Sequence, residues 1–240
     1  MANNITKKLE KLIIKAVSET IEPLERPFGI LLSGGVDSGL LAALSKPDIA
    51  LTCRFNYKGN YDEFDSSEKI VKHLGLNQEV VEPTKEDFFK YLPEAVKMFR
   101  PTTHFSLVPL YMLFKRAREL GIKTILSGEG PDEYLGGYTS YTFITHEQKL
   151  YDQEELRPYK PLLDRYLGTP KERFARILGK KPSDFDPYWD KYENLLSKIG
   201  YTDLQVREIE EMELALAKGF GIHLVYPYMT SEVEEFCFTQ

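Results

Sequence analysis

Two glycine-rich stretches of this chain combine serine hydroxyls with acidic side chains. The first is SGGVDS at residues 33–38, and the second is SGEGPDEYLGGY at residues 127–138. Glycine allows a tight turn and lets backbone N–H groups approach an anion closely. Hydroxyl groups can donate to phosphate oxygens, and carboxylates are ligands that Mg²⁺ prefers. These residue types therefore predict binding of a phosphate-bearing ligand together with a divalent cation.

Each glycine-rich stretch directly follows an apolar run that suits a strand. The runs are Phe28–Leu32 before the first stretch and Ile122–Leu126 before the second. Continuous apolar runs are typical of strands that are buried on both faces of a sheet. In an open parallel sheet, ligands bind beyond the carboxyl ends of the strands. We therefore expect both stretches to face one ligand.

Strand-like and helix-like segments alternate over residues 28–127. This alternation predicts an α/β fold, with a parallel sheet flanked by helices and right-handed crossovers. Thr84 is expected to cap the helix that follows it. The expected strands are 28–32, 49–55, 79–81 and 122–126, and the expected helices are 5–21, 37–44, 65–74, 84–99 and 107–120.

A different pattern begins after residue 140. Prolines recur between short helical segments, and a longer helix is expected at 203–218, with Thr202 and Gln205 as a capping box and Gly219 as its stop. The last part of the chain is therefore predicted to be a C-terminal helical region. Because no clear linker separates the parts, we expect one domain over residues 1–240, with an α/β core at 1–140 and a helical cap at 141–240.

The first stretch resembles the pyrophosphate-binding loop, or PP-loop, of the N-type ATP pyrophosphatases, whose fold is adenine nucleotide alpha hydrolase-like. The second resembles the S-G-E-G-A-D-E-x-x-G-G-Y signature of asparagine synthetases and β-lactam synthetases, with Pro131 where alanine is usual. The resemblance covers residues 28–140 well and 210–235 loosely. It implies an ATP-dependent ligase of asparagine synthetase type. Such an enzyme adenylates a carboxylate, here aspartate or an analogue, releases pyrophosphate, and then amidates the product with ammonia.

The resemblance also implies roles for individual residues, with ATP and Mg²⁺ as cofactors. Glu129 and Asp132 would be catalytic, with Glu129 beside the reacting acyl group and the incoming amine. Asp37 and Asp132 would bind Mg²⁺ at the phosphates. The residues that would bind the nucleotide are Leu32, Ser33, Gly34, Gly35, Asp37, Ser38, Cys53, Ser127 and Gly128.

The chain departs from the family pattern near its C-terminus. The family usually shows G-x-E-x-R-x-P-F-L-D there, and this chain has GIHLVYPYMT at residues 221–230, so that His223, Val225 and Thr230 replace the Glu, Arg and Asp. The family's catalytic lysine would lie beyond Gln240, and Arg54 stands where a small residue is common. The acceptor acid, and whether turnover survives these changes, stay open at this point.

The nitrogen donor is also open. Glutamine-using members of the family begin with a catalytic cysteine directly after the initiator methionine, where this chain has Ala2. We therefore expect no glutaminase domain and no glutaminase activity, with free ammonia or a separate glutaminase subunit as the source of nitrogen. A homodimer is compatible with the sequence, which does not define the oligomeric state.

The composition of the chain indicates which classes of binding partner and which cellular compartment to expect. The net charge is −6 and the isoelectric point is about 5.4, which argues against a broad basic face for nucleic acid. Cys53 and Cys237 form no C-x-x-C pair, which favours a reducing cytoplasm. No apolar run approaches the ~20 residues of a membrane span. Two alternatives remain: a degenerate ATP-binding subunit that acts only with a partner, and a tRNA-modifying adenylating enzyme.

Overall fold

The computed structural model describes residues 2–55, 63–100, 104–155, 157–206 and 209–239. The chain forms two compact units, and each contains segments that are distant in sequence. Unit 1 comprises Met1–Glu129 and Glu208–Thr230, and unit 2 comprises Gly130–Arg207 and Ser231–Gln240. This division differs from the boundary expected at residue 140, because the segment after Glu208 returns to the sheet.

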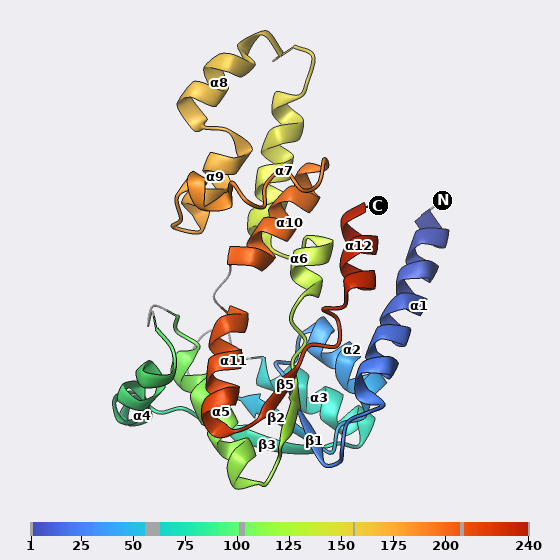
Figure 1. The fold of residues 1–240 in the computed structure, drawn as a ribbon, viewed down its shortest axis with the longest axis vertical. Helices are drawn as coiled ribbons and strands as arrows, with labels where there is room; N and C mark the ends of the chain where they lie inside the picture. The colour runs from blue at the N-terminus through green and yellow to red at the C-terminus, as the bar shows by residue number, and fades with distance from the viewer. Residues whose placement is uncertain (1, 56–62, 101–103, 156, 207–208, 240) are drawn as a thin grey trace. The chain divides into compact units, whose positions relative to one another are not determined.

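Unit 1 is built on a five-stranded sheet in which every neighbouring pair is parallel (Figure 1). The strand order is β3-β2-β1-β4-β5. The structure therefore confirms the predicted α/β fold with a parallel sheet. The strands are β1 (Phe28–Leu31), β2 (Ile49–Cys53), β3 (Asn77–Val81), β4 (Thr124–Leu126) and β5 (His223–Val225).

Strand β5 corrects the expectation that everything after residue 140 is helical. It pairs in parallel with β4, with Thr124 opposite His223 and Leu126 opposite Val225. Three residues are too few to show a strand period in the sequence. The segment becomes a strand because the edge of β4 offers backbone groups that need partners.

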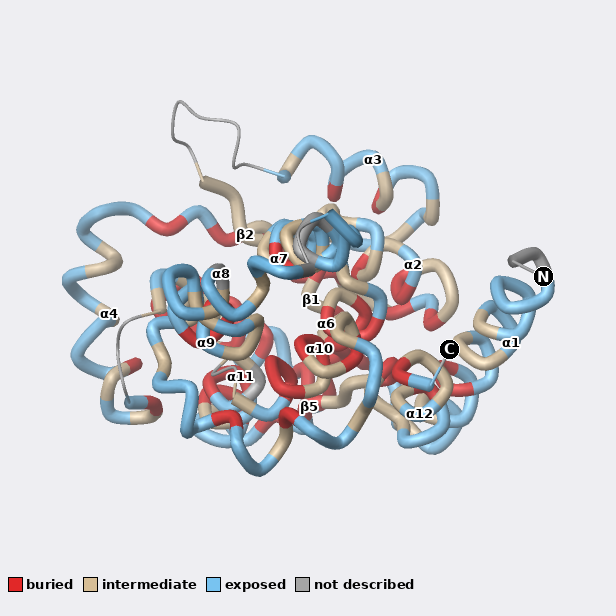
Figure 2. The backbone as a smooth tube through the Cα atoms, turned by 90° about the horizontal axis from the view of Figure 1, so that it is seen from above, coloured by how far each residue is buried: buried red, intermediate tan, exposed pale blue. Residues whose placement is uncertain are grey.

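Helices cover both faces of the sheet in unit 1. One apolar cluster includes Leu51 and Ile125 with side chains of α4, α5 and α11. The other includes Ile30 and Leu126 with side chains of α1, α2 and α3. Along α3, short buried positions alternate with longer exposed and half-buried ones (Figure 2). The helices are α1 (Ala2–Ile21), α2 (Val36–Ser45), α3 (Phe64–Leu74), α4 (Lys85–Met98), α5 (Leu107–Glu119) and α11 (Ile209–Phe220).

Of the two helix caps expected from the sequence, the one at Thr84 is confirmed and the one at Thr202 is wrong. Thr84 caps α4, because its hydroxyl accepts from the N–H of Asp87 at 3.1 Å and the Asp87 carboxylate accepts from the Thr84 N–H at 3.0 Å. Thr202 instead lies buried inside helix α10 (Leu195–Val206). Asn194 caps that helix, with its side-chain oxygen 2.8 Å from the N–H of Leu196. The apolar pattern therefore placed the start of this helix too late in the sequence.

Unit 2 is helical and has its own apolar cluster, which includes Tyr141, Phe174, Phe185 and Trp189. No helix among the described residues is long and apolar enough to cross a membrane. The elements of unit 2 are α6 (Pro131–Leu135), α7 (Thr139–Tyr151), η1 (Arg157–Tyr159), α8 (Lys160–Leu167), α9 (Pro170–Ile177), η2 (Pro182–Phe185), α10 and α12 (Ser231–Thr239).

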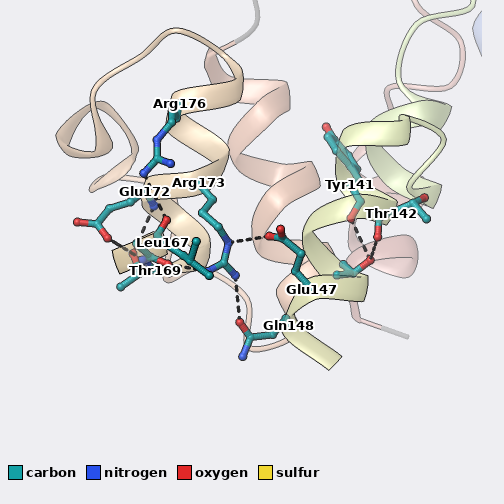
Figure 3. Close-up of polar contacts among 11 residues, drawn as sticks. Tyr141, Thr142, Glu147, Gln148, Leu167, Thr169, Glu172, Arg173 and Arg176 are labelled. Atoms are coloured by element: carbon teal, nitrogen blue, oxygen red, sulfur yellow. Dashed lines mark hydrogen bonds and ion pairs between the residues drawn. The ribbon is translucent and has the colours of Figure 1, made fainter. Parts of the chain in front are cut away.

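A buried arginine joins two of the helices of unit 2 (Figure 3). Arg173 on α9 lies 3.1 Å from the carboxylate of Glu147 on α7 and donates to the carbonyl of Gly168 at 2.6 Å. A buried charge is tolerated only when it is paired and hydrogen-bonded. The pair therefore orients α9 on α7, and it has a structural role.

Candidate functional site

The first glycine-rich stretch leads from β1 into α2. Gly35 occupies the N-cap position in an extended conformation, and no side chain caps the helix there. The first N–H groups of a helix lack partners within the helix and attract anions. Val36, the first residue of α2, is 84% exposed. This end of α2 is therefore suited to a phosphate group.

Gly34 shapes the turn that carries these N–H groups. Its φ is +103°, and a Cβ there would lie 2.6 Å from the carbonyl oxygen of Glu63 and 2.8 Å from the nitrogen of Ser67. Only glycine fits such a conformation so close to another backbone. The turn is therefore seated on the start of α3, which fixes the direction of the stretch.

The two serines of the first stretch are brought together. Their hydroxyl oxygens are 3.1 Å apart, and the N–H of Gly35 donates to the Ser33 hydroxyl at 3.1 Å. Ser33 is exposed and Ser38 is buried. Both predicted hydroxyl donors thus lie at the same turn as the N–H groups of α2.

Leu32 and Cys53, which are both predicted to bind the nucleotide, lie at the ends of strands. The N–H of Leu32 donates to the carbonyl of Leu51 at 2.9 Å, and its carbonyl accepts from the Thr52 hydroxyl at 3.0 Å. A nucleotide contact from Leu32 would therefore use the second lone pair of that carbonyl. Cys53 is the half-buried last residue of β2.

The second glycine-rich stretch follows β4, the neighbour of β1 in the sheet. Ser127 is buried, and its N–H donates to the carbonyl of Val225 at 2.9 Å. A Cβ on Gly128 would lie 3.2 Å from the nitrogen of Ser38. The backbone of the second stretch therefore passes directly against the first turn of α2, and the two stretches meet within unit 1.

The meeting point lies where the strand order reverses. From β1 the chain moves outward to β2 and β3, and it then continues on the other side with β4 and β5. Crevices at such reversals, outside the carboxyl ends of the strands, are the ligand sites of open parallel sheets. Both predicted nucleotide-binding loops leave the two strands that flank this reversal.

The acidic residues of the second stretch fall into the two units. Glu129 is half-buried at the end of unit 1, and Asp132 lies in the first turn of α6 in unit 2. Gly130, with a φ of +112°, stands between them. Asp37, the other predicted metal ligand, belongs to unit 1.

Glu133 has a structural role that the sequence analysis did not assign. Its side chain is buried and accepts a hydrogen bond from the Tyr138 hydroxyl at 2.8 Å. The tyrosine that ends the signature is the sequence signal that could have indicated this. Glu133 therefore has a hydrogen-bond partner within unit 2, while the neighbouring Asp132 is only half-buried.

The predicted Mg²⁺ site uses isolated carboxylates, which is how proteins commonly bind Mg²⁺ together with a nucleotide. Among the described residues, no group of three or more His, Cys, Asp or Glu side chains could form a metal site by itself. Mg²⁺ is usually bound by one or two carboxylates plus substrate phosphates, rather than by a protein cage. That Asp37 and Asp132 each supply one such carboxylate stays a prediction.

Gly137 leaves the space that the Asp132 carboxylate fills. A Cβ on Gly137 would lie 1.8 Å from Oδ1 of Asp132. Gly137→Ala must therefore displace that carboxylate, because its Cβ would also lie 2.8 Å from Cγ and 3.2 Å from Cα of Asp132. If Asp132 binds Mg²⁺, we expect the Mg²⁺ dependence of ATP binding, measured by calorimetry, to weaken about tenfold, the size of one charged contact. Ser140→Ala is the control, and an unchanged Mg²⁺ dependence would remove Asp132 from the metal site.

The structure also shows where Arg54 and the altered C-terminal frame, residues 221–230, lie in unit 1. The guanidinium of Arg54 lies 4.5 Å from the centre of the Phe64 ring and 3.4 Å from the carboxylate of Glu82. The altered frame forms β5 and the turn after it, with His223 as the first residue of the strand. The carbonyl of Val225 in this frame accepts the hydrogen bond from the N–H of Ser127.

The family model for asparagine synthase matches residues 8–239. The chain belongs to the asparagine synthase family. It is 30% identical over 168 residues to asparagine synthetase [glutamine-hydrolyzing] 2 of Arabidopsis thaliana, covering 64% of this chain and 28% of the relative. It is 23% identical over 172 residues to asparagine synthetase B [glutamine-hydrolyzing] of Escherichia coli strain K12, covering 63% and 31%. This member of the family thus spans less than a third of the length of these relatives.

Two solved structures show a weaker likeness to this asparagine synthase family member. The U34-tRNA thiolase NcsA from Methanococcus maripaludis has a TM-score of 0.41 at 16% identity, covering 89% of this chain and 79% of that one. The NH3-dependent NAD synthetase from Campylobacter jejuni has a TM-score of 0.40 at 15% identity, covering 84% and 94%. Scores this low support no assignment of substrate or reaction.

Proposed function

We propose that this chain is an ATP-dependent carbon–nitrogen ligase of asparagine synthetase type, which forms AMP and pyrophosphate. The observation that supports it best is the meeting of the two signature stretches at the strand reversal, where Gly128 packs against Ser38. The family membership of residues 8–239 agrees with this proposal. The acceptor is aspartate or an analogue, and the nitrogen comes from free ammonia or a separate glutaminase subunit.

The proposed roles follow the chemistry of each group. The N–H groups at the start of α2, with Ser33 and Ser38, bind the β- and γ-phosphates. Asp37 and Asp132 hold Mg²⁺, which supplies positive charge at the phosphate oxygens when it is bound. The remaining nucleotide contacts come from Leu32, Gly34, Gly35, Cys53, Ser127 and Gly128.

The first half-reaction activates the carboxylate. An oxygen of the acceptor carboxylate attacks the α-phosphorus and forms an acyl–O–P bond, while the bond between the α- and β-phosphates breaks and pyrophosphate leaves. A leaving pyrophosphate is stabilised by preorganised N–H groups at a helix N-terminus. The exposed start of α2 provides such groups.

The second half-reaction forms the amide. Ammonia attacks the acyl carbon, AMP leaves with the bridging oxygen, and the nitrogen loses a proton. Glu129 follows Gly128 on the second stretch, and we assign to it the handling of that proton. The replacement of the family Glu, Arg and Asp by His223, Val225 and Thr230 bears on the choice of acceptor.

The products of ATP decide this proposal. With L-aspartate, ammonia and MgCl₂, we expect ATP to yield AMP and pyrophosphate in equal amounts, measured by phosphorus NMR. A panel of other carboxylic acids, tested by ATP–pyrophosphate exchange, would define the acceptor. Formation of ADP and phosphate would contradict the proposal, and exchange that requires tRNA would favour a tRNA-modifying enzyme instead.

A further inference from the structure

The segment from β5 to Tyr228 contacts both signature stretches within unit 1. The carbonyl of Val225 accepts from the N–H of Ser127 at 2.9 Å. The hydroxyl of Tyr228 donates to the backbone carbonyl of Asp37 at 2.9 Å. One short segment therefore joins a stretch that follows β1 to a stretch that follows β4.

Tyr228 is held rigidly in the core. Its side chain is 1% exposed and belongs to the cluster that includes Phe28, Leu41 and Leu126. Burial, with the nearby charge of Asp37, raises the pKa of its hydroxyl well above the ordinary value. The hydroxyl is therefore enclosed by the core, with the backbone carbonyl of Asp37 as its acceptor.

The bond reaches the place where the phosphates are proposed to bind. Asp37 is the second residue of α2, directly after the exposed Val36. Ser38, the next residue, contacts the backbone of Gly128. The first turn of α2 is thus held on one side by Gly128 and on another by the Tyr228 hydroxyl.

We propose that Tyr228 is a positioning residue, whose hydroxyl holds the backbone of Asp37 and so orients the first turn of α2 toward Mg²⁺-ATP. This inference rests on the proposed function. The family pattern has phenylalanine at this position of the C-terminal frame, so the hydroxyl is an addition in this chain.

Tyr228→Phe tests the hydroxyl alone, because phenylalanine fills the same space. Tyr111→Phe is the matched control: Tyr111 is 3% exposed, its hydroxyl contacts Glu94, and both residues lie in unit 1. We expect Tyr228→Phe to bind ATP with Mg²⁺ roughly three- to tenfold more weakly by calorimetry, as for loss of one buried hydrogen bond. We also expect faster amide hydrogen exchange in ligand-free peptides that cover residues 36–42. Tyr111→Phe should change neither quantity.

The outcomes separate this inference from the proposed function. If the unaltered protein does not bind ATP with Mg²⁺, the proposed function is wrong, and the exchange rates still show whether the hydroxyl holds α2. If the unaltered protein binds and Tyr228→Phe matches it in both affinity and exchange, the positioning role is wrong. Faster exchange with unchanged affinity would also overturn it, because α2 would then move without affecting the nucleotide.

Discussion

Gly35→Val is expected to lower the affinity for ATP by about a hundredfold or more while leaving the protein folded. Among the described residues, a Cβ at Gly35 meets only the Ser33 hydroxyl, at 3.3 Å, and the backbone there is extended, so that a side chain is expected to be tolerated. The branched side chain would instead cover the N–H groups at the start of α2. Losing two hydrogen bonds to charged phosphate corresponds to an effect of about this size. Calorimetric titration with ATP and Mg²⁺, alongside thermal unfolding, measures both quantities.

Val36→Ala is the control for that experiment. Val36 is the adjacent, exposed residue, and its truncation leaves the N–H groups open. We expect its affinity for ATP to match that of the unaltered protein. Unchanged affinity in Gly35→Val would mean that the phosphates bind elsewhere, and the assignment of the first stretch would then be wrong.

Glu129→Gln is expected to slow amide formation by about a hundredfold while ATP binding stays nearly intact. General acid–base catalysis typically contributes 10²- to 10⁴-fold to a rate. Glutamine keeps the shape of the side chain, but it cannot accept the proton that the incoming ammonia must lose. The rate is measured in a single turnover, in which a preformed complex of enzyme, ATP and acceptor is mixed with ammonium.

Glu82→Gln makes the same chemical change at the exposed ion pair with Arg54 and should leave the rate unchanged. If Glu129→Gln forms amide as fast as the unaltered protein, then Glu129 does not move the proton. If ATP binding falls together with the rate, then Glu129 acts in binding instead.

Local patterns in the sequence were sufficient for most of unit 1. The apolar runs before residues 33 and 127 became β1 and β4, because continuous apolar strands are buried on both faces of a parallel sheet. Thr84 capped α4 as predicted, since a capping box involves residues only three positions apart. The glycine-rich stretches follow strands as predicted, because each apolar run and the stretch after it are adjacent in the sequence.

Other features depended on partners that no local pattern identifies. Segment 223–225 forms strand β5 because it pairs with the edge of β4. Gly34 is required because the backbones of Glu63 and Ser67 occupy the space that a Cβ would need. The expected start of a helix near Thr202 was wrong, because burial of that residue inside α10 is decided by packing. Apolar periodicity indicates which face of a helix is buried, but it does not indicate which neighbouring helix or strand covers that face.

The class of fold, the family and the two stretches that are candidates for ATP binding could be predicted without a structure, because each depends on residues close together along the chain. The contact of Gly128 with Ser38 and the hydrogen bond from Tyr228 to Asp37 could not be predicted in this way. The burial of Glu133 against Tyr138, beside an Asp132 that is not fully buried, could not be predicted either. These contacts join segments through the folded core, and their distances depend on how the sheet and helices pack. A hydrogen bond between residues 191 positions apart has no signature in either local segment.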